Sequence, residues 1–389
     1  MLDLHGVQLS SVLDDAVRIR AVDSSNMSCI VQRFPELCED AIVLGESLEI
    51  PEKVRVNSKI TIVYSKPNQI IVVGMGGSAI GSEMLRSWLL DRCPIPMEIC
   101  RDYHLPKYAG LRTLVVAVSY SGNTEETLNA FVEAVERGCM TVSVSSGGFL
   151  EEFSHRLGLP HLRIPSGYPP RSAIPYLFFP LASALRKLNV ISSFDAEASE
   201  AISTLKTLRA EIGLDSPTDM NPSKRVAVAL EGLIPMVCGF GQYVAVASRM
   251  KSQFNENSKT PAKFEFFPEL NHNETLGWTG SKNLTRVFGV IIIRSDDEPP
   301  EIKARIEITR ELVLNQGAGT VTEIWSRGSG QLARMLSVMY VGDFASIYLG
   351  VLYGIDPTST SIIEELKKRL GDKLKKDDEL RQKVGKLLA

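Results

Sequence analysis

Hydroxyl side chains are concentrated in one stretch, Leu114-Val-Val-Ala-Val-Ser-Tyr-Ser-Gly-Asn-Thr-Glu-Glu-Thr127. An apolar, β-branched run opens it, and apolar residues recur at helical spacing from Leu128 onward, which predicts a strand, a loop and a helix. Ser119, Ser121 and Thr124 therefore lie at a helix N-terminus, where unpaired backbone amides and the helix dipole attract an anion by roughly 0.3–2 kcal/mol. We expect these hydroxyls to bind a phosphate group. The alternative is a serine-rich turn that only caps the helix.

Length and composition are those of a globular chain with room for two domains. The sequence has 389 residues, of which 44% are hydrophobic and 23% charged, and a net charge of −3. No basic excess indicates nucleic acid or an anionic membrane as a partner. No apolar run reaches the ~18 residues of a membrane span, and the longest, 340–353, is interrupted by Asp343 and Gly350, which predicts a buried helix.

The cysteines indicate a reducing compartment. Six cysteines show no C-x-x-C spacing and no metal-ligand pairing with the five histidines. The N-terminus has neither the basic nor the apolar part of a secretory signal. We therefore expect reduced thiols, a cytoplasmic location, and neither a metal nor a cofactor.

Alternating strand and helix patterns predict two related α/β domains, each a parallel sheet with helices on both sides. The expected boundaries are 1–66 for a helical N-terminal extension, 67–190 for the first domain, 191–222 for a helical linker, 223–355 for the second domain and 356–389 for a C-terminal helical segment. In the first domain we expect strands beginning at Gln69 and over 96–100, 114–118, 140–144 and 162–165. The second domain repeats the scheme with a strand from Ile234, strands at 287–294 and 320–325, and a helix at 300–315.

Ligands of such sheets bind beyond the carboxyl ends of the strands. The glycine-rich turn at 74–78 and the hydroxyl loop at 119–124 both follow strands and should meet there. In the second domain the strand at 290–294 is followed by Ser295-Asp-Asp-Glu298, whose carboxylates would repel a phosphate. We therefore expect one phosphate site per chain.

Four motifs occur in order: Gly76-Gly-Ser-Ala-Ile-Gly81, Ser119-Tyr-Ser-Gly-Asn-Thr-Glu-Glu126, Pro169-Pro-Arg171, and Phe254-Asn-Glu-Asn-Ser-Lys259 with Asn271-His-Asn-Glu274. With them the chain resembles the sugar isomerase (SIS) fold, and specifically the archaeal-type bifunctional phosphoglucose/phosphomannose isomerases, over residues 69–367. The resemblance implies two tandem SIS-type domains. It also implies that glucose 6-phosphate and mannose 6-phosphate are interconverted with fructose 6-phosphate through a cis-enediol, in a homodimer with a shared active site.

The resemblance assigns the sugar phosphate to the two glycine-containing loops. The residues are Gly77, Ser78, Ser119, Ser121 and Thr124. Glu256 is similar to the family's base, which must reach two adjacent carbons, and partial burial would raise its pKa toward neutrality. By itself, a glutamate near a helix end is usually a surface residue.

Three further roles follow from the resemblance, each with a plainer alternative. His272 corresponds to the histidine that opens the sugar ring and is supplied by the partner subunit, although a loop histidine is usually just exposed. Arg171 would stabilise the enediolate charge, or form only a surface salt bridge. Thr360 would leave room at C2 of the sugar, with Thr358 as a competitor or a helix cap. Lys367 could reach the site, but a lysine on an amphipathic helix is usually solvated.

Two other functions compete with the isomerase. Gly74-x-Gly76-x-x-Ala79 followed by Glu98 matches a dinucleotide-binding fingerprint, which would indicate an NAD(P)-dependent dehydrogenase. That fingerprint does not explain the hydroxyl loop. A non-catalytic sugar-phosphate sensor would normally carry a basic DNA-binding segment, and residues 1–66 show no basic excess.

Overall fold

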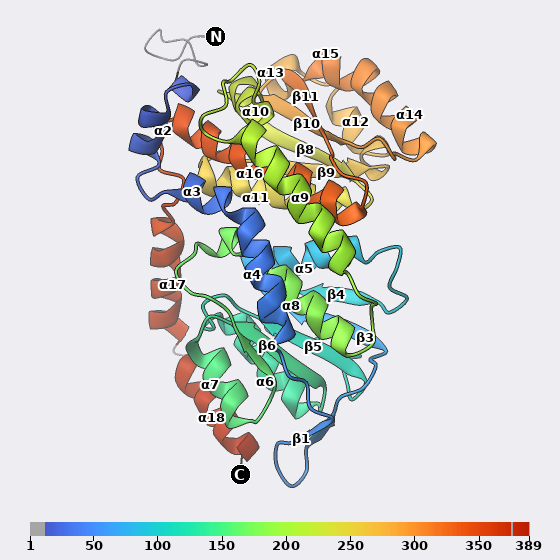
Figure 1. Cartoon of the computed structure of the whole chain (residues 1–389), viewed down its shortest axis with the longest axis vertical. Helices are drawn as coiled ribbons and strands as arrows, with labels where there is room; N and C mark the ends of the chain where they lie inside the picture. The colour runs from blue at the N-terminus through green and yellow to red at the C-terminus, as the bar shows by residue number, and fades with distance from the viewer. Residues whose placement is uncertain (1–11, 375, 389) are drawn as a thin grey trace. The chain divides into compact units, whose positions relative to one another are not determined.

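The computed structural model describes residues 12–374 and 376–388, and these residues form two compact units (Figure 1). The 36–193 unit comprises Glu36–Ser193 and the C-terminal segment from Thr360. The 194–359 unit comprises Phe194–Ser359 and the N-terminal segment up to Pro35. Each unit contains one parallel sheet with flanking helices, which confirms the predicted α/β fold.

The sheet of the 36–193 unit has five parallel strands in the order β4-β3-β5-β6-β7. The strands are β3 (Gln69–Val73), β4 (Met97–Cys100), β5 (Thr113–Val118), β6 (Met140–Ser145) and β7 (His161–Arg163). Every residue of β5 and β6 is buried, as expected for strands covered on both faces. Val73 lies beside Ala117, and Ala117 beside Ser143. The loops after β3, β5 and β6 therefore leave the sheet at the same edge.

Helices cover both faces of this sheet (Figure 1). The helices of the unit are α4 (Phe34–Glu46, from Glu36 on), α5 (Gly77–Trp88), α6 (Glu125–Glu136), α7 (Gly148–Arg156), the 3₁₀ turn η1 (Pro170–Ser172), α8 (Ile174–Lys187), α17 (Ser361–Leu374) and α18 (Lys376–Leu388). The crossover from β3 to β4 runs along the sheet in one direction. The crossovers from β5 to β6 and from β6 to β7 run in the opposite direction. Right-handed crossovers therefore place α5 on one face and α6 and α7 on the other.

The 194–359 unit repeats this topology with one strand fewer. Its parallel sheet has the order β11-β10-β8-β9. The strands are β8 (Ile234–Phe240), β9 (Lys263–Phe267), β10 (Phe288–Arg294) and β11 (Thr320–Trp325). The helical elements are α2 (Ala16–Val22), α3 (Met27–Gln32), α9 (Asp195–Ile212), α10 (Pro222–Leu230), α11 (Tyr243–Asn257), η2 (Glu269–Asn271), α12 (Glu274–Gly277), α13 (Lys282–Thr285), α14 (Pro300–Thr309), η3 (Arg310–Leu314), α15 (Asn315–Gly317) and α16 (Gln331–Leu352).

Helix α16 is long and apolar enough to cross a membrane, but 94% of its most apolar window is buried within the protein. This confirms the prediction of a buried helix at 340–353. Helix α11 packs closely against it, because a Cβ on Gly342 would lie 2.4 Å from Met250 Cε. The buried ion pair between Arg249 and Asp343, 2.6 Å long, also joins the two helices. The middle of α11 is therefore held against α16.

Three expectations differ from the structure. Residues 1–66 were expected to be helical, but β1 (Lys53–Arg55) and β2 (Thr61–Val63) form an antiparallel hairpin within them. Strand β9 was not foreseen. The helix expected over 300–315 is α14 followed by a π-helical turn, η3. The domain boundaries remain a prediction, since the compact units divide the N-terminal extension near Pro35.

Candidate active site

The two loops that the sequence singled out meet at the switch point of the five-stranded sheet. Strands β3 and β5 are neighbours, and the chain crosses over in opposite directions from them. Ligands of open parallel sheets bind outside the carboxyl ends of the strands at such a point. The Tyr120 amide donates to Ser78 Oγ at 3.1 Å, which joins the loop after β5 to the turn after β3.

The Ser119 and Thr124 hydroxyls form the inner part of the loop after β5. Their oxygens lie 2.9 Å apart, and Ser119 Oγ also accepts the Gly122 amide at 3.1 Å. Thr124 occupies the N-cap position of α6, but its side chain makes no hydrogen bond to the first-turn amides. The alternative that these hydroxyls only cap the helix is therefore wrong for Thr124. Ser121 is exposed, and its Oγ accepts the Asn123 amide at 3.3 Å.

Two helix N-termini converge on this point. Helix α5 begins after Gly76 without a side-chain cap and has no acidic residue in its first turn. Helix α6 carries Glu125 and Glu126 in its first turn, where they favour the helix but oppose an anion. An anion is therefore stabilised more by α5, whose first turn includes Gly77 and the buried Ser78.

Gly77 also fixes the position of Arg171. A Cβ on Gly77 would lie 2.9 Å from the Pro170 carbonyl oxygen and 3.2 Å from the Arg171 amide. Only a glycine allows η1 to approach α5 this closely. Arg171 is 3% exposed, so the surface salt-bridge alternative is wrong for this arginine. The structure thus brings Arg171 to the element that carries Gly77 and Ser78.

A third loop, at 145–150, forms hydrogen bonds with the hydroxyl loop at 119–124, and sequence reasoning did not identify it. The bonds are Ser146 N to Tyr120 O at 2.9 Å, Leu150 N to Gly122 O at 2.9 Å and Phe149 N to Asn123 Oδ1 at 3.0 Å. The signal was present, because Ser145-Ser-Gly-Gly148 follows a buried strand just as the hydroxyl loop does.

Glu256 lies in the last turn of α11 in the 194–359 unit and is half-buried. The helix is anchored there by the Asn257 side chain, which donates to Ser346 Oγ of α16 at 2.9 Å. The Asn257 carbonyl oxygen lies 2.9 Å from the place that a Cβ on Gly350 would take. The Lys259 ammonium donates to the Glu256 carbonyl oxygen. The glutamate is therefore presented on a fixed backbone.

His272 is exposed and directly follows η2. Its backbone is held, because its amide donates to Glu269 O at 2.9 Å. The neighbouring Asn271 side chain donates to Thr309 Oγ1 at 2.7 Å, and Glu274 pairs with Lys263 at 2.8 Å. The imidazole thus projects from an ordered turn rather than into the core of its own unit.

The structure distinguishes Thr358 from Thr360. The Thr358 amide donates to Asp356 Oδ1 at 2.8 Å, so this residue lies in a turn and is not the cap of the following helix. Thr360 directly precedes α17, and its hydroxyl donates to Glu364 Oε1 at 2.9 Å. Lys367 is exposed on α17. The roles of Thr360 and Lys367 at the sugar remain predictions.

Comparison with known proteins identifies the family in which these motifs occur. The model of the bacterial phospho-glucose isomerase C-terminal SIS domain matches residues 219–370. A bifunctional phosphoglucose/phosphomannose isomerase of Caldicellulosiruptor bescii is 37% identical over 86% of this chain and 98% of its own length. The chain belongs to the bifunctional phosphoglucose/phosphomannose isomerase family. The resemblance inferred from the four motifs is confirmed.

Two further relatives extend the comparison. A D-glucosamine-6-phosphate 4-epimerase of Sulfolobus acidocaldarius is 34% identical over 69% of this chain and 78% of its own length. A hypothetical protein of Thermus thermophilus shares the fold, with a TM-score of 0.68 and 18% identity, and covers 94% of this chain and 96% of its own. The first shows that a different reaction on a sugar phosphate occurs among relatives of similar identity.

The equivalent switch point of the 194–359 unit is filled by the chain itself. At the end of β10 the Ser295 amide donates to Glu298 Oε1 at 2.8 Å, and Arg294 Nε donates to the same oxygen at 2.7 Å. The Arg294 and Glu298 side chains are 3% and 2% exposed. The Glu298 carboxylate thus accepts the hydrogen bond of an amide that a bound anion would need. This supports the expectation of one phosphate site per chain.

The dinucleotide alternative fits the structure poorly. Glu98 lies within β4, beside Ile71 and two residues before the strand ends at Cys100. A ribose-binding carboxylate would be needed at the carboxyl end of that strand. Glu98 is also exposed. The glycines of this turn are instead explained by the backbone: a Cβ on Gly74 would lie 3.0 Å from the Val118 carbonyl oxygen, and Gly76 has a φ of +51°.

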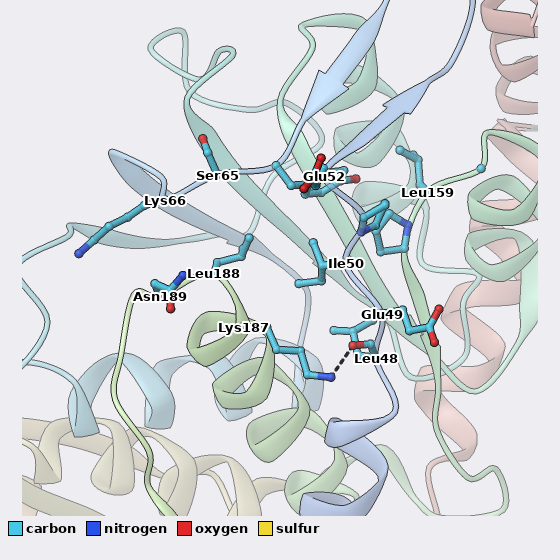
Figure 2. A pocket seen from close by; sticks show the side chains of 14 residues that line it. Leu48, Glu49, Ile50, Glu52, Ser65, Lys66, Leu159, Lys187, Leu188 and Asn189 are labelled. Atoms are coloured by element: carbon cyan, nitrogen blue, oxygen red, sulfur yellow. Dashed lines mark hydrogen bonds between the residues drawn. The ribbon is translucent and has the colours of Figure 1, made fainter.

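A pocket of about 780 Å³ lies elsewhere in the 36–193 unit (Figure 2). It opens at the amino ends of the strands, since Lys66 precedes β3 and Pro160 precedes β7. Lys187 donates to the Leu48 carbonyl oxygen at 2.6 Å and so completes the end of the α4 segment rather than reaching for a ligand. None of the predicted site residues lines this pocket.

Removing the Ser121 and Thr124 hydroxyls should weaken substrate binding. The Ser121→Ala/Thr124→Ala double variant is expected to raise KM for fructose 6-phosphate by at least about 100-fold with little change in kcat, because hydrogen bonds to a charged group contribute roughly 1.5–3 kcal/mol each. Steady-state kinetics measure this. Ser58→Ala/Thr61→Ala, on the exposed hairpin β1–β2, is the matched control. An unchanged KM would place the phosphate elsewhere.

The loop at 145–150 should be sensitive to acid through His161. Its Nδ1 lies 2.8 Å from Ser143 Oγ, and Ser145 Oγ donates to the Gly147 carbonyl oxygen at 2.8 Å. Burial lowers the pKa of His161 from 6.5 to about 4. Between these values the unfolded chain binds the proton more readily, so this contribution to stability is present above pH 6.5 and is lost as the pH falls.

Between pH 7 and pH 5 the melting temperature of the His161→Gln variant is therefore expected to fall by less than that of the unaltered protein. Thermal unfolding followed by circular dichroism measures the difference. Equal pH dependence in the His161→Gln variant and the unaltered protein would contradict the role of His161.

Proposed function

We propose that this protein is an aldose–ketose isomerase that interconverts glucose 6-phosphate and mannose 6-phosphate with fructose 6-phosphate. The observation that carries the proposal is the cluster of Ser78, Ser119 and Thr124 at two helix N-termini, in a chain of this isomerase family. Hydroxyls and amides hold a monoester dianion without a metal or a nucleotide. The half-buried Glu256 supplies the base that proton transfer between carbons requires.

The proposed reaction moves two protons. Glu256 removes the proton from C2 of the open-chain aldose, the electrons of that bond form the C1–C2 double bond of the cis-enediolate, and the carboxyl group returns the proton to C1. A second proton moves from O2 to O1. Arg171 stabilises the negative charge that develops on the enediolate oxygens. His272 exchanges protons with the ring oxygen and O1, which opens the cyclic sugar.

Acceptance of both aldoses requires that C2 be reprotonated on either face. We propose that Thr360 borders the space in which the C2–C3 bond rotates, because this threonine directly precedes α17 and its hydroxyl donates to Glu364. Lys367, two turns further along α17, would contact the sugar from the same helix. Both assignments rest on the family resemblance and on the places of the two residues, Thr360 directly before α17 and Lys367 within it.

We further propose that the protein acts as a homodimer with a shared active site in the cytoplasm. Helix α17 supports a second copy as its partner, because Ile362, Leu366 and Leu370 form an apolar stripe and are 77%, 56% and 42% exposed. The exposed His272 suits a residue that serves the partner's site. All six cysteines are free thiols, as a reducing compartment requires.

The relative from Sulfolobus acidocaldarius makes 4-epimerisation of an amino sugar phosphate the second candidate. Both reactions act on a sugar 6-phosphate, so variants of the loop that binds the phosphate do not distinguish the two reactions. The position of proton exchange does. Isomerisation through an enediol exchanges hydrogen at C1 and C2, whereas epimerisation changes the configuration at C4.

The decisive experiment is incubation of fructose 6-phosphate with the purified protein in D₂O with EDTA present, followed by NMR of the products. We expect glucose 6-phosphate and mannose 6-phosphate that carry deuterium at C2. Products without deuterium would contradict exchange of the Glu256 proton with the solvent during the reaction. Binding without any product would favour a sensor, and a 4-epimer from D-glucosamine 6-phosphate alone would favour the epimerase.

A further inference from the structure

Tyr120 connects separate segments of the 36–193 unit through its own polar groups. The residue lies between Ser119 and Ser121 and is 8% exposed. The bonds are Tyr120 N to Ser78 Oγ at 3.1 Å, Ser146 Oγ to Tyr120 O at 2.7 Å, Tyr120 Oη to Pro165 O at 3.0 Å and Tyr168 N to Tyr120 Oη at 2.9 Å. The backbone of this tyrosine joins the turn after β3 to the loop after β6, while its phenol reaches the segment after β7.

The segment that the phenol holds leads directly to Arg171. Tyr120 Oη donates to Pro165 and accepts from Tyr168, so it closes the bend around Gly167, whose φ is +92°. Burial raises the pKa of the Tyr120 phenol, which keeps its proton in place for the bond to Pro165. After Tyr168 the chain enters η1, and no free loop intervenes before the arginine.

The other end of the segment is held by contact with α5. The Pro170 carbonyl oxygen lies 2.9 Å from the place that a Cβ on Gly77 would take. Within η1 the Ser172 amide donates to Pro169 O at 2.9 Å. The stretch from Pro165 to Arg171 is thus fixed at its start by Tyr120 and at its end by Gly77. Both anchors belong to the elements that form the phosphate site.

We propose that the Tyr120 hydroxyl is a positioning group that sets where Arg171 lies relative to the phosphate loop. The loop that holds the phosphate of the substrate would then also place the cation that faces the enediolate. This inference rests on the proposed function, because it assigns Arg171 to the transition state. Tyr120 itself does not touch the reacting atoms, and its effect is exerted through Arg171.

The test compares Tyr120→Phe with Tyr64→Phe. Both changes remove one buried phenol oxygen from the same unit, and Tyr64 Oη donates to Thr141 O at 2.7 Å, on β6 and outside the site. Tyr120→Phe is expected to lower kcat by about 10²-fold with little change in KM, since displacement of a catalytic group by ~1 Å costs about that much. Tyr64→Phe should lower the melting temperature and leave both constants unchanged.

Binding measurements give a readout that does not need turnover. 5-Phospho-D-arabinonate carries a planar carboxylate that resembles the enediolate, whereas sorbitol 6-phosphate carries the phosphate without it. By calorimetry, Tyr120→Phe should lose affinity for the arabinonate by at least about 10-fold and keep its affinity for the sorbitol phosphate. Each variant is measured at a temperature at which circular dichroism shows it to be folded.

A double-mutant cycle with Arg171→Lys separates positioning from general destabilisation. If Tyr120 acts through Arg171, adding Tyr120→Phe to Arg171→Lys should lower kcat by less than about 3-fold. Full additivity in kcat, or equal loss of affinity for both ligands, would overturn the inference. Failure of the unaltered protein to isomerise fructose 6-phosphate would instead refute the proposed function, which keeps the two outcomes distinguishable.

Discussion

The Glu256→Gln substitution is expected to lower kcat by roughly 10²–10⁴-fold and to leave the affinity for fructose 6-phosphate nearly unchanged. Glutamine has the size and the hydrogen-bonding shape of glutamate but accepts no proton at neutral pH. The side chain is half-buried in the last turn of α11, whose backbone is held against α16 by Asn257 and Gly350. The substitution should therefore remove the base without moving the helix. Stopped-flow kinetics and calorimetry measure the two constants.

The control for this substitution is Glu231→Gln, a half-buried glutamate at the end of α10 in the same unit, which should retain full activity. Mixing the inactive Glu256→Gln protein with an inactive His272→Ala protein tests the shared site. If His272 serves the partner's base, exchange of subunits restores some sites with both groups intact, and activity returns. Retained turnover in Glu256→Gln would remove this residue as the base, and absence of recovery in the mixture would contradict a shared site.

The positions of the central strands could be predicted because their burial follows from composition. Strands β5 and β6 are apolar throughout and lie in the middle of the sheet, where both faces are covered. Because glycine and serine directly follow β3 and β5, the sequence also predicted that these two loops meet beyond the carboxyl ends of the strands. Local sequence was sufficient there, because a strand, a loop and a helix N-terminus are neighbours along the chain.

The hairpin β1–β2 was missed although its pattern is local. Lys53-Val-Arg55 and Thr61-Ile-Val63 alternate between exposed and buried residues, and the Asn57 side chain forms the turn by accepting the Lys59 and Ile60 amides at 2.8 Å. The short strands were read as part of an amphipathic helix. Strand β9 was also missed. Its residues form a strand by pairing with β8, and the local sequence pattern does not reveal this pairing.

The parts of the site that sequence reasoning could not supply depend on long-range backbone contacts. Tyr120 reaches Pro165, and Ser146 reaches Tyr120, across distances in the chain that no periodicity encodes. The burial of Arg171 is likewise a consequence of η1 packing on Gly77. Motifs predicted which residues carry the chemistry, but the contacts that position them appear only once the sheet has brought separate loops together.

Among substitutions of residues without a polar side chain, Gly122→Ala is expected to cause the largest loss of activity. This residue has a φ of +71°, and a Cβ there would lie 1.7 Å from the Gly147 carbonyl oxygen and 2.7 Å from its carbon. Both obstacles are backbone atoms, so the loops at 119–124 and 145–150 must separate. The Gly122→Ala variant is expected to lose at least about 10²-fold in kcat/KM, mainly through KM, and to unfold at a lower temperature.

Substitutions of two other glycines show how the Gly122→Ala result is to be interpreted. Gly110→Ala is the control, because a Cβ there meets nothing within 4 Å. Gly148→Ala should resemble Gly122→Ala, since its Cβ would lie 2.5 Å from Asn123 Oδ1 and thus strain the same interface from the opposite side. Stabilisation by inorganic phosphate, measured as a shift in melting temperature, should disappear in both variants and persist in Gly110→Ala. If Gly122→Ala retained its KM while folded, the contact between the two loops would not be what shapes the phosphate site.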